Sequence, residues 1–229
     1  MSEWIKVTAS DGNELSAYVA RPAGEPKAAL VVVQEIFGVN SHIQAVADEW
    51  AADGFLCIAP AMFDRIEKDV FLGYDEAGWA KAMTLAKQID FDKALLDVEA
   101  SLAWLRAEAE VPVGIIGYCF GGTMAWITSC RSKVDAAVGY YGGAISNFLN
   151  EEPQNPILLH FGGKDAHIPA ETVAKIQSAH PEVPVFVYDE AGHAFNRKAD
   201  PTAYVAESAL LAKKRSLLFF EQHMGLTIV

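Results

Sequence analysis

A tight turn between an apolar run and a helix-like run places the strongest constraint on this chain. Residues 113–116 read Val-Gly-Ile-Ile and predict a buried strand, which leads directly into Gly117-Tyr118-Cys119-Phe120-Gly121. The pattern Gly-x-Cys-x-Gly is typical of a nucleophile elbow, whose strained central residue needs nearly side-chain-free neighbours two positions away. The small and apolar residues that follow predict a helix, whose N-terminal partial positive charge favours the thiolate of Cys119. The alternative is a chance match at an ordinary strand-to-helix turn.

Strand-like and helix-like segments alternate along the rest of the chain. The turn at 10–13 joins two strand-like runs and predicts an N-terminal antiparallel hairpin. The alternation predicts an α/β fold in one domain, 1–229, with a mostly parallel twisted sheet and helices on both faces. The expected buried strands are 28–34, 55–59, 113–116, 136–141, 157–161 and 185–188, and the expected helices follow 40, cover 91–105, follow 121 and 169, and cover 202–223.

The stretch 64–89 is the least regular and most polar part of the chain. It lies between the strand at 55–59 and the long helix expected over 91–105. Two interpretations stay open for it, the wall of a binding pocket and a plain surface excursion.

Composition excludes several classes of partner. With a net charge of −12 and no basic cluster, the chain is a poor ligand for nucleic acids and anionic membranes. No apolar run approaches the roughly 20 residues that cross a bilayer, and the N-terminal residues do not resemble a secretion signal. Three cysteines without paired spacing suggest free thiols in a reducing compartment. We therefore expect a cytoplasmic protein in which Cys57 and Cys130 are packing residues. A monomer is a separate expectation that these observations do not determine.

Two further residues at strand ends could complete an acyl-transfer site with Cys119. Asp165 closes the strand at 157–161 and its Gly-Gly turn, and His193 follows the last strand. Catalytic groups of an open parallel sheet emerge at the carboxyl ends of its strands, and a hydrolase needs a nucleophile, a base and a group that orients the base. The alternatives are a helix-capping role for Asp165 and a structural role for His193.

The remaining histidines lack such a setting, and His160 within a buried strand is expected to be a core residue. They are His42, His160, His167, His180 and His223. No cluster of His, Cys and Asp has the spacing of metal ligands. We therefore expect neither a metal nor another cofactor.

Glu35 ends the first buried strand, in Gln34-Glu35-Ile36-Phe37-Gly38. A buried carboxylate is costly unless it has a partner, so we predict that Glu35 is partly buried and hydrogen-bonds Cys119. A solvated strand-end Glu is the alternative. The backbone N–H groups of Phe120 and Ile36 are the predicted donors to the oxyanion that forms during acyl transfer.

These motifs together resemble the dienelactone hydrolase (carboxymethylenebutenolidase) family, across essentially the whole chain and in matching order. The resemblance is carried by residues 34–40, the elbow at 117–122, Asp165 and Gly192-His193-Ala194-Phe195. It implies the α/β-hydrolase fold and a Cys-His-Asp enzyme that opens an enol-lactone to maleylacetate, within the catabolism of chlorinated aromatic compounds. It also implies that Glu35 holds the resting Cys119 thiol and takes its proton when the substrate binds.

By the same resemblance the substrate is a small lactone or ester that carries a carboxylate, held by arginines. Arg197 occupies one family position, four residues after His193. The second arginine is missing, since residues 66–105 contain none. Lys81 could replace it as a point charge, and Trp79 and Tyr74 could line the pocket or belong to the core.

Two alternative functions remain open from the sequence. One is a carboxylesterase or thioesterase on the same scaffold with another acyl substrate, which the missing arginine favours. The other is a redox sensor with Cys119 as its thiol. A sensor usually has a nearby resolving cysteine, and neither Cys57 nor Cys130 is expected close to Cys119.

Overall fold

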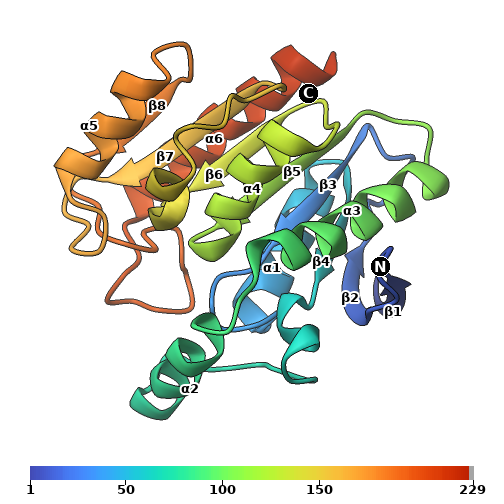
Figure 1. Cartoon of the computed structure of the whole chain (residues 1–229). Coiled ribbons are helices and arrows are strands. Elements are labelled where there is room, and N and C mark those ends of the chain that lie inside the picture. Colours follow the sequence, from blue (N-terminus) through green and yellow to red (C-terminus); the bar gives the residue numbers. More distant parts are fainter. Residues whose placement is uncertain (227–229) are drawn as a thin grey trace. The chain divides into compact units, whose positions relative to one another are not determined.

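The computed structural model describes residues 1–226, which form two compact units, 1–115 and 116–226 (Figure 1). The strand β5 (Val113–Tyr118) leads the chain from the first unit into the second. The first unit contains β1 (Ser2–Thr8), β2 (Glu14–Ala20), β3 (Ala28–Val33), α1 (Ser41–Ala52), β4 (Phe55–Pro60), η1 (Met62–Arg65), α2 (Glu76–Ala86) and α3 (Phe91–Glu108). The second contains α4 (Phe120–Arg131), β6 (Ala137–Tyr140), η2 (Gly143–Asn147), β7 (Ile157–Gly162), α5 (Ala170–Ala179), β8 (Val185–Tyr188) and α6 (Ala206–Met224).

The strands of the first unit lie in the order β1-β2-β4-β3. The β1–β2 pair is antiparallel, with Ser2 opposite Ala20, and confirms the predicted hairpin. The β3–β4 pair is parallel, and every residue of both strands is buried, as their continuous apolar sequences predict. The helix between them begins at a cap, because the side chain of Asn40 accepts a hydrogen bond from the N–H of Ile43.

Residues 62–89 are more regular than the sequence analysis predicts. The 11-residue helix α2 lies there, and Figure 1 shows it standing away from the strands of its unit. Asp75 caps this helix by accepting a hydrogen bond from the N–H of Gly78 at 2.7 Å. The helix escaped prediction because its buried face consists only of Gly78, Ala82 and Leu85, too small a set to give a clear helical period.

An arginine fork anchors the start of this segment within the first unit. Arg65 Nε donates to the fully buried carboxylate of Asp97 at 2.6 Å, and Nη1 donates to Asp11 at 2.7 Å. Asn13 Nδ2 also donates to Asp97. The fork therefore joins the hairpin turn, η1 and α3 through one guanidinium.

The second unit has the strand order β5-β6-β7-β8, and the β6–β7 and β7–β8 pairs are parallel. Helix α4 packs against β6, and α6 packs against β7. The strands and α-helices lie in the predicted parts of the unit, but α6 begins at 206 instead of 202, and the short helix η2 was not predicted. Whether 1–229 is a single domain stays a prediction, and its last three residues lie outside the described part of the chain.

Buried polar side chains of the second unit form a network that joins β6, β7 and β8 to α6. His160 Nε2 lies 3.0 Å from Ser216 Oγ, and His160 Nδ1 lies 3.0 Å from the hydroxyl of Tyr188. The hydroxyl of Tyr140 lies 2.8 Å from the same Ser216 Oγ. Burial, with a smaller contribution from the charge of Arg215, lowers the pKa of His160 to about 3, so the ring is neutral. This confirms the prediction that His160 is a hydrogen-bonded core residue.

None of the helices in the described residues is both long enough and apolar enough to span a bilayer.

Candidate active site

The turn after β5 holds Cys119 in a conformation that L-residues rarely adopt. Its backbone has φ 55° and ψ −112°, and α4 begins at the next residue. A Cβ on Gly117 would lie 1.8 Å from the carbonyl oxygen of Gly121, and one on Gly122 would lie 2.4 Å from that of Tyr140. The chain can approach itself this closely only because glycine has no side chain. The geometry confirms a strained strand-turn-helix elbow with the thiol at its apex.

Backbone hydrogen bonds fix the elbow on both sides of Cys119. The N–H of Cys119 donates to the carbonyl of Tyr140 at 3.0 Å. Its carbonyl accepts from the N–H groups of Gly122 and Thr123 in the first turn of α4, at 3.0 and 3.2 Å. Because the backbone is fixed and the side chain is half-buried, the thiol is presented at the N-terminus of α4, where the helix dipole favours negative charge.

Asp165 and His193, which lie after β7 and β8, form a hydrogen-bonded pair. His193 Nδ1 lies 2.7 Å from Asp165 Oδ2. The other oxygen of Asp165 accepts from the N–H groups of His167 and Ile168 at 2.8 and 3.1 Å. Burial raises the pKa of Asp165, but these hydrogen bonds outweigh it and hold the pKa below its usual value. A charged, fixed carboxylate therefore orients the imidazole.

The imidazole of His193 also hydrogen-bonds the side chain of Cys119. Burial lowers the pKa of His193, but the hydrogen bonds and negative charges of Asp165 and Cys119 outweigh it and raise the pKa to about 10. An imidazole held between a carboxylate and a cysteine side chain is an arrangement that can activate a cysteine. The second unit therefore brings Cys119, His193 and Asp165 together in one chain of hydrogen bonds.

We expect the His193 ring of the wild-type protein to titrate with a midpoint near pH 10 in an NMR pH titration. Because the pKa is raised above the ordinary 6.5, the stabilisation of the folded state is complete below about pH 6.5. It is lost as the pH rises through about 10. In Cys119→Ser the hydrogen bond and charge that Cys119 contributes to the pKa of His193 are changed, so the midpoint should fall by at least about 1 unit, or about 1.4 kcal/mol.

A His193 midpoint near 6.5 in both proteins would contradict the contribution of Asp165 and Cys119 to the raised pKa of His193.

The sequence analysis did not single out Tyr141, whose aromatic ring packs against His193. The ring centroid of Tyr141 lies 4.8 Å from that of His193, and the Tyr141 hydroxyl donates a hydrogen bond to Asn196 Oδ1. Tyr141 directly follows β6 and has a positive φ of 39°. The sequence feature that could have identified Tyr141 is its position at the carboxyl end of a parallel strand, where the binding sites of such sheets lie.

Glu35 and Ile36 lie in the first unit, just after β3. Glu35 is completely buried, which excludes the solvated strand-end alternative. Ile36 is half-buried against a cluster of Phe63, Val70 and Leu85. Phe120 is the first residue of α4, so its N–H belongs to the helix N-terminus. The roles of Glu35 and of the two backbone donors stay predictions.

The four predicted substrate-binding residues have different surroundings. Tyr74 and Trp79 both make edge-to-face contacts with Phe37, at centroid distances of 4.8 and 4.9 Å. Lys81 Nζ pairs with Glu67 at 2.5 Å. Arg197 is buried in the second unit, and its Nη1 donates to Asp200 at 3.3 Å. Each of the two cations thus already has an acidic neighbour.

The other two thiols are placed as packing residues. Cys57 is fully buried in β4, and burial raises the pKa of the Cys130 thiol to about 11. All three cysteines are free thiols. Neither Cys57 nor Cys130 has the environment of a reactive thiolate.

Comparison with known proteins agrees with this geometry. The family model of the dienelactone hydrolase family matches residues 15–224. The carboxymethylenebutenolidase of Pseudomonas putida is 33% identical over 227 residues, 96% of each chain. A putative carboxymethylenebutenolidase of Azospirillum brasilense is 35% identical over 229 residues, 96% of this chain and 99% of that protein. The crystal structure of a putative dienelactone hydrolase from Klebsiella pneumoniae superposes with a TM-score of 0.83 at 28% identity, covering 97% and 99% of the two chains.

The parallel strands, the antiparallel hairpin and the elbow define an α/β-hydrolase, as the sequence predicts. The chain belongs to the dienelactone hydrolase family. It is therefore a hydrolase of carboxylic esters or lactones, with a small molecule as its substrate.

Proposed function

We propose that this protein opens an enol-lactone that carries a carboxylate, converting dienelactone (carboxymethylenebutenolide) to maleylacetate through an acyl-enzyme on Cys119. The observation that carries the proposal is the hydrogen-bonded chain Cys119–His193–Asp165 at a strained strand-to-helix turn. The name of the Pseudomonas putida relative supports the choice of substrate. The reaction class itself follows from the family.

In the first half of the proposed reaction, the thiolate of Cys119 attacks the lactone carbonyl. The charge that develops on the carbonyl oxygen is stabilised by the N–H groups of Phe120 and Ile36. The bond between the carbonyl carbon and the ring oxygen then breaks, giving a thioester and an enolate. The enolate is stable enough to leave without an acid, and it takes up a proton on carbon or oxygen afterwards.

In the second half, water hydrolyses the thioester. Acylation removes the negative charge of Cys119 and its hydrogen bond, two of the causes that raise the pKa of His193. Any proton that the imidazole carries then passes to the enolate, and the neutral ring takes one from the attacking water. Asp165 keeps its ring orientation throughout. Cys119 leaves as the thiolate, and the product carboxylate departs.

Glu35 is the proposed regulator of the resting thiol. Its complete burial supports a partner other than water. By the family resemblance, it limits the amount of thiolate until the substrate arrives and then accepts the proton of Cys119. The three free thiols suit a reducing compartment, which supports the expectation of a cytoplasmic enzyme.

Arg197 is the proposed anchor of the substrate carboxylate. It lies in the same unit as Cys119, four residues beyond His193, and its buried guanidinium binds an anion far more strongly than an exposed one would. Tyr74 and Trp79 are the proposed aromatic wall of the pocket. Lys81 is the proposed second cation, although it pairs with Glu67.

That ion pair favours one alternative substrate class. With Lys81 engaged and no arginine between residues 66 and 105, a second carboxylate anchor is missing. A carboxylesterase or thioesterase that takes neutral acyl groups would need no such anchor. The two functions share one mechanism and differ only in the substrate.

A substrate profile tests the proposal on the purified protein. Cis- and trans-dienelactone are compared with short p-nitrophenyl esters, and kcat/KM is expected to be higher for a dienelactone. Arg197→Gln should raise KM for dienelactone at least about 10-fold, because a charge-assisted hydrogen bond of about 1.5–3 kcal/mol is lost. The KM for neutral esters should stay within about 2-fold.

Arg131→Gln is the matched control, since this arginine lies on α4 and pairs with Glu151. A melting temperature measured for each variant separates loss of binding from loss of folding. Turnover of p-nitrophenyl esters without turnover of either dienelactone would reject the lactonase in favour of the esterase. An equal rise of KM on neutral esters would remove Arg197 from carboxylate binding.

A further inference from the structure

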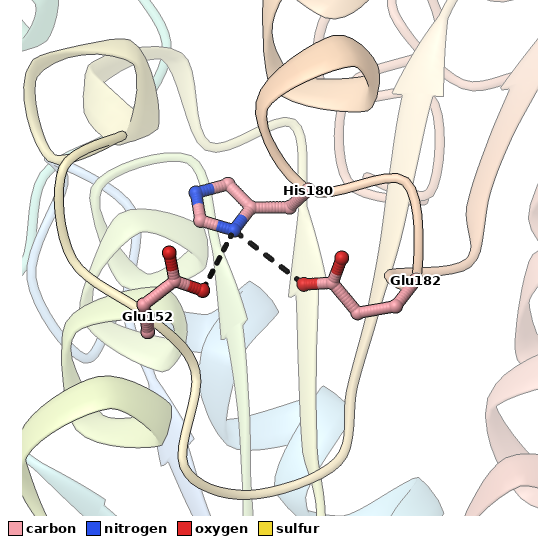
Figure 2. A group of neighbouring side chains, drawn as sticks. All are labelled: Glu152, His180 and Glu182. Carbon is pink, nitrogen blue, oxygen red and sulfur yellow. Dashed lines mark ion pairs between the residues drawn. The ribbon is translucent and has the colours of Figure 1, made fainter.

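Three side chains of the second unit converge at a place that the hydrolytic mechanism does not use. Glu152 lies in the loop before β7, and His180 and Glu182 lie in the connection between α5 and β8. One ligand atom of each residue lies within 4.8 Å of the other two. Figure 2 shows both carboxylates directed toward the same nitrogen of His180.

The hydrogen bonding of His180 determines which nitrogen faces the carboxylates. His180 Nε2 lies 3.0 Å from the carbonyl oxygen of Leu149. A carbonyl only accepts hydrogen bonds, so Nε2 carries a proton, and in the neutral ring Nδ1 presents a lone pair. Packing fixes this orientation, because His180 is 1% exposed and its ring lies edge-on to Trp126 at 4.9 Å.

The buried Nδ1 is without a hydrogen bond to any described residue. It lies 3.7 Å from an oxygen of Glu152 and 3.5 Å from one of Glu182. Both distances exceed the 2.7–3.2 Å of an N–H···O hydrogen bond, so a proton on Nδ1 would be well shared with neither carboxylate. Three potential metal ligands, one ring nitrogen and two carboxylate oxygens, thus face one another.

The spacing of these three donors suits a metal ion. Zinc bonds to nitrogen and carboxylate oxygen are about 2.0–2.2 Å, which places neighbouring ligand atoms of a tetrahedral site about 3.4 Å apart. The two distances from Nδ1 are close to that value. The distance between the two carboxylate oxygens can shorten to this value, because the side chains of Glu152 and Glu182 are 74% and 62% exposed and can change conformation.

The ligand chemistry selects among metals. One imidazole and two carboxylates suit Zn²⁺ and its first-row neighbours, whereas Mg²⁺ and Ca²⁺ prefer oxygen ligands throughout. The hydrogen bond from Nε2–H to a backbone carbonyl is also the usual outer partner of a metal-bound histidine. Solvent reaches the two glutamates, so water can complete the coordination.

We propose that Glu152, His180 and Glu182 form a binding site for Zn²⁺ or a similar divalent transition-metal ion. The ion would join the loop before β7 to the α5–β8 connection and stabilise the second unit. Local spacing in the sequence gave no sign of it, because 27 residues separate Glu152 from His180. This site is separate from the proposed lactonase site and does not depend on it.

Zinc binding to the purified full-length protein, followed by isothermal titration calorimetry, tests the site. Cys119→Ser is used throughout, because a reactive thiol beside a histidine also binds zinc. The expected result is one Zn²⁺ per chain and a higher melting temperature with Zn²⁺ than with EDTA. Glu152→Gln and Glu182→Gln should each weaken binding at least about 10-fold, since changes at metal sites cost 10–100-fold in affinity.

Glu171→Gln is the matched control, because it removes an exposed carboxylate that lies in α5, outside the proposed site. It should bind Zn²⁺ as tightly as the parent protein. Equal melting temperatures in EDTA would show that all variants fold. Co²⁺ should give visible d–d bands that Glu182→Gln removes. Absence of stoichiometric Zn²⁺ binding, or equal binding by the two glutamate variants and the control, would overturn the proposal.

Discussion

Cys119→Ala is expected to lower kcat/KM for every ester or lactone substrate by at least about 10³-fold, because in the proposed mechanism it removes the atom that forms the acyl-enzyme. Cys119→Ser should also lose most activity. The hydroxyl is a much weaker nucleophile than the thiolate of the proposed mechanism. Initial rates at saturating and limiting substrate measure the effect.

The control for this prediction is Cys130→Ser, which changes a half-buried thiol in the same unit. Its kcat/KM should stay within about 2-fold of the wild type, because burial raises the pKa of that thiol to about 11 and keeps it unreactive. Mass spectrometry of a quenched reaction should detect the acyl group on the peptide that contains Cys119. Full activity of Cys119→Ala would exclude covalent catalysis at this residue.

Gly117→Ala is expected to destabilise the protein by at least about 3 kcal/mol, among the larger effects of a single substitution. The added Cβ would lie 1.8 Å from a backbone oxygen of Gly121, and no rotation of a side chain can relieve that contact. For a chain of this length such a loss lowers the melting temperature by about 6–12 °C. Activity should fall as well, because any relaxation moves the elbow.

Gly24→Ala provides the comparison, since a Cβ at that exposed position meets nothing within 4 Å. Its free energy of unfolding should change by no more than about 0.5 kcal/mol. Urea unfolding of the two variants, with kcat/KM measured in parallel, gives both quantities. A Gly117→Ala protein as stable and active as the wild type would contradict the tight elbow.

Much of this fold could be predicted because its signals are local. Buried parallel strands appear as continuous apolar runs. Asn40 caps the start of α1 and Gly54 follows its end, as such residues usually do at helix termini. Helix α2 could not be predicted, because its small buried face carries little periodicity. The start of α6 was also misplaced, as helix ends depend on packing that a sequence does not display.

The residues of the candidate site could likewise be predicted only where the sequence carries a local signal. Cys119, Asp165 and His193 follow predicted strands or a recognisable turn, so strand order alone suggested that they meet. Tyr141 and the cluster around His180 depend on which segments the fold brings together. Residues 28 positions apart, such as Glu152 and His180, carry no local pattern, and their proximity is visible only in three dimensions.

The hydrogen bonds of Ser216 help to determine the position of α6. Its single hydroxyl serves Tyr140, His160 and the Ala212 carbonyl of its own helix. A shift of α6 by one residue would leave two buried groups unpaired, at about 1–3 kcal/mol each. Tyr140 is also the residue whose carbonyl receives the N–H of Cys119. Ser216 thereby helps to fix the position of Cys119 through Tyr140.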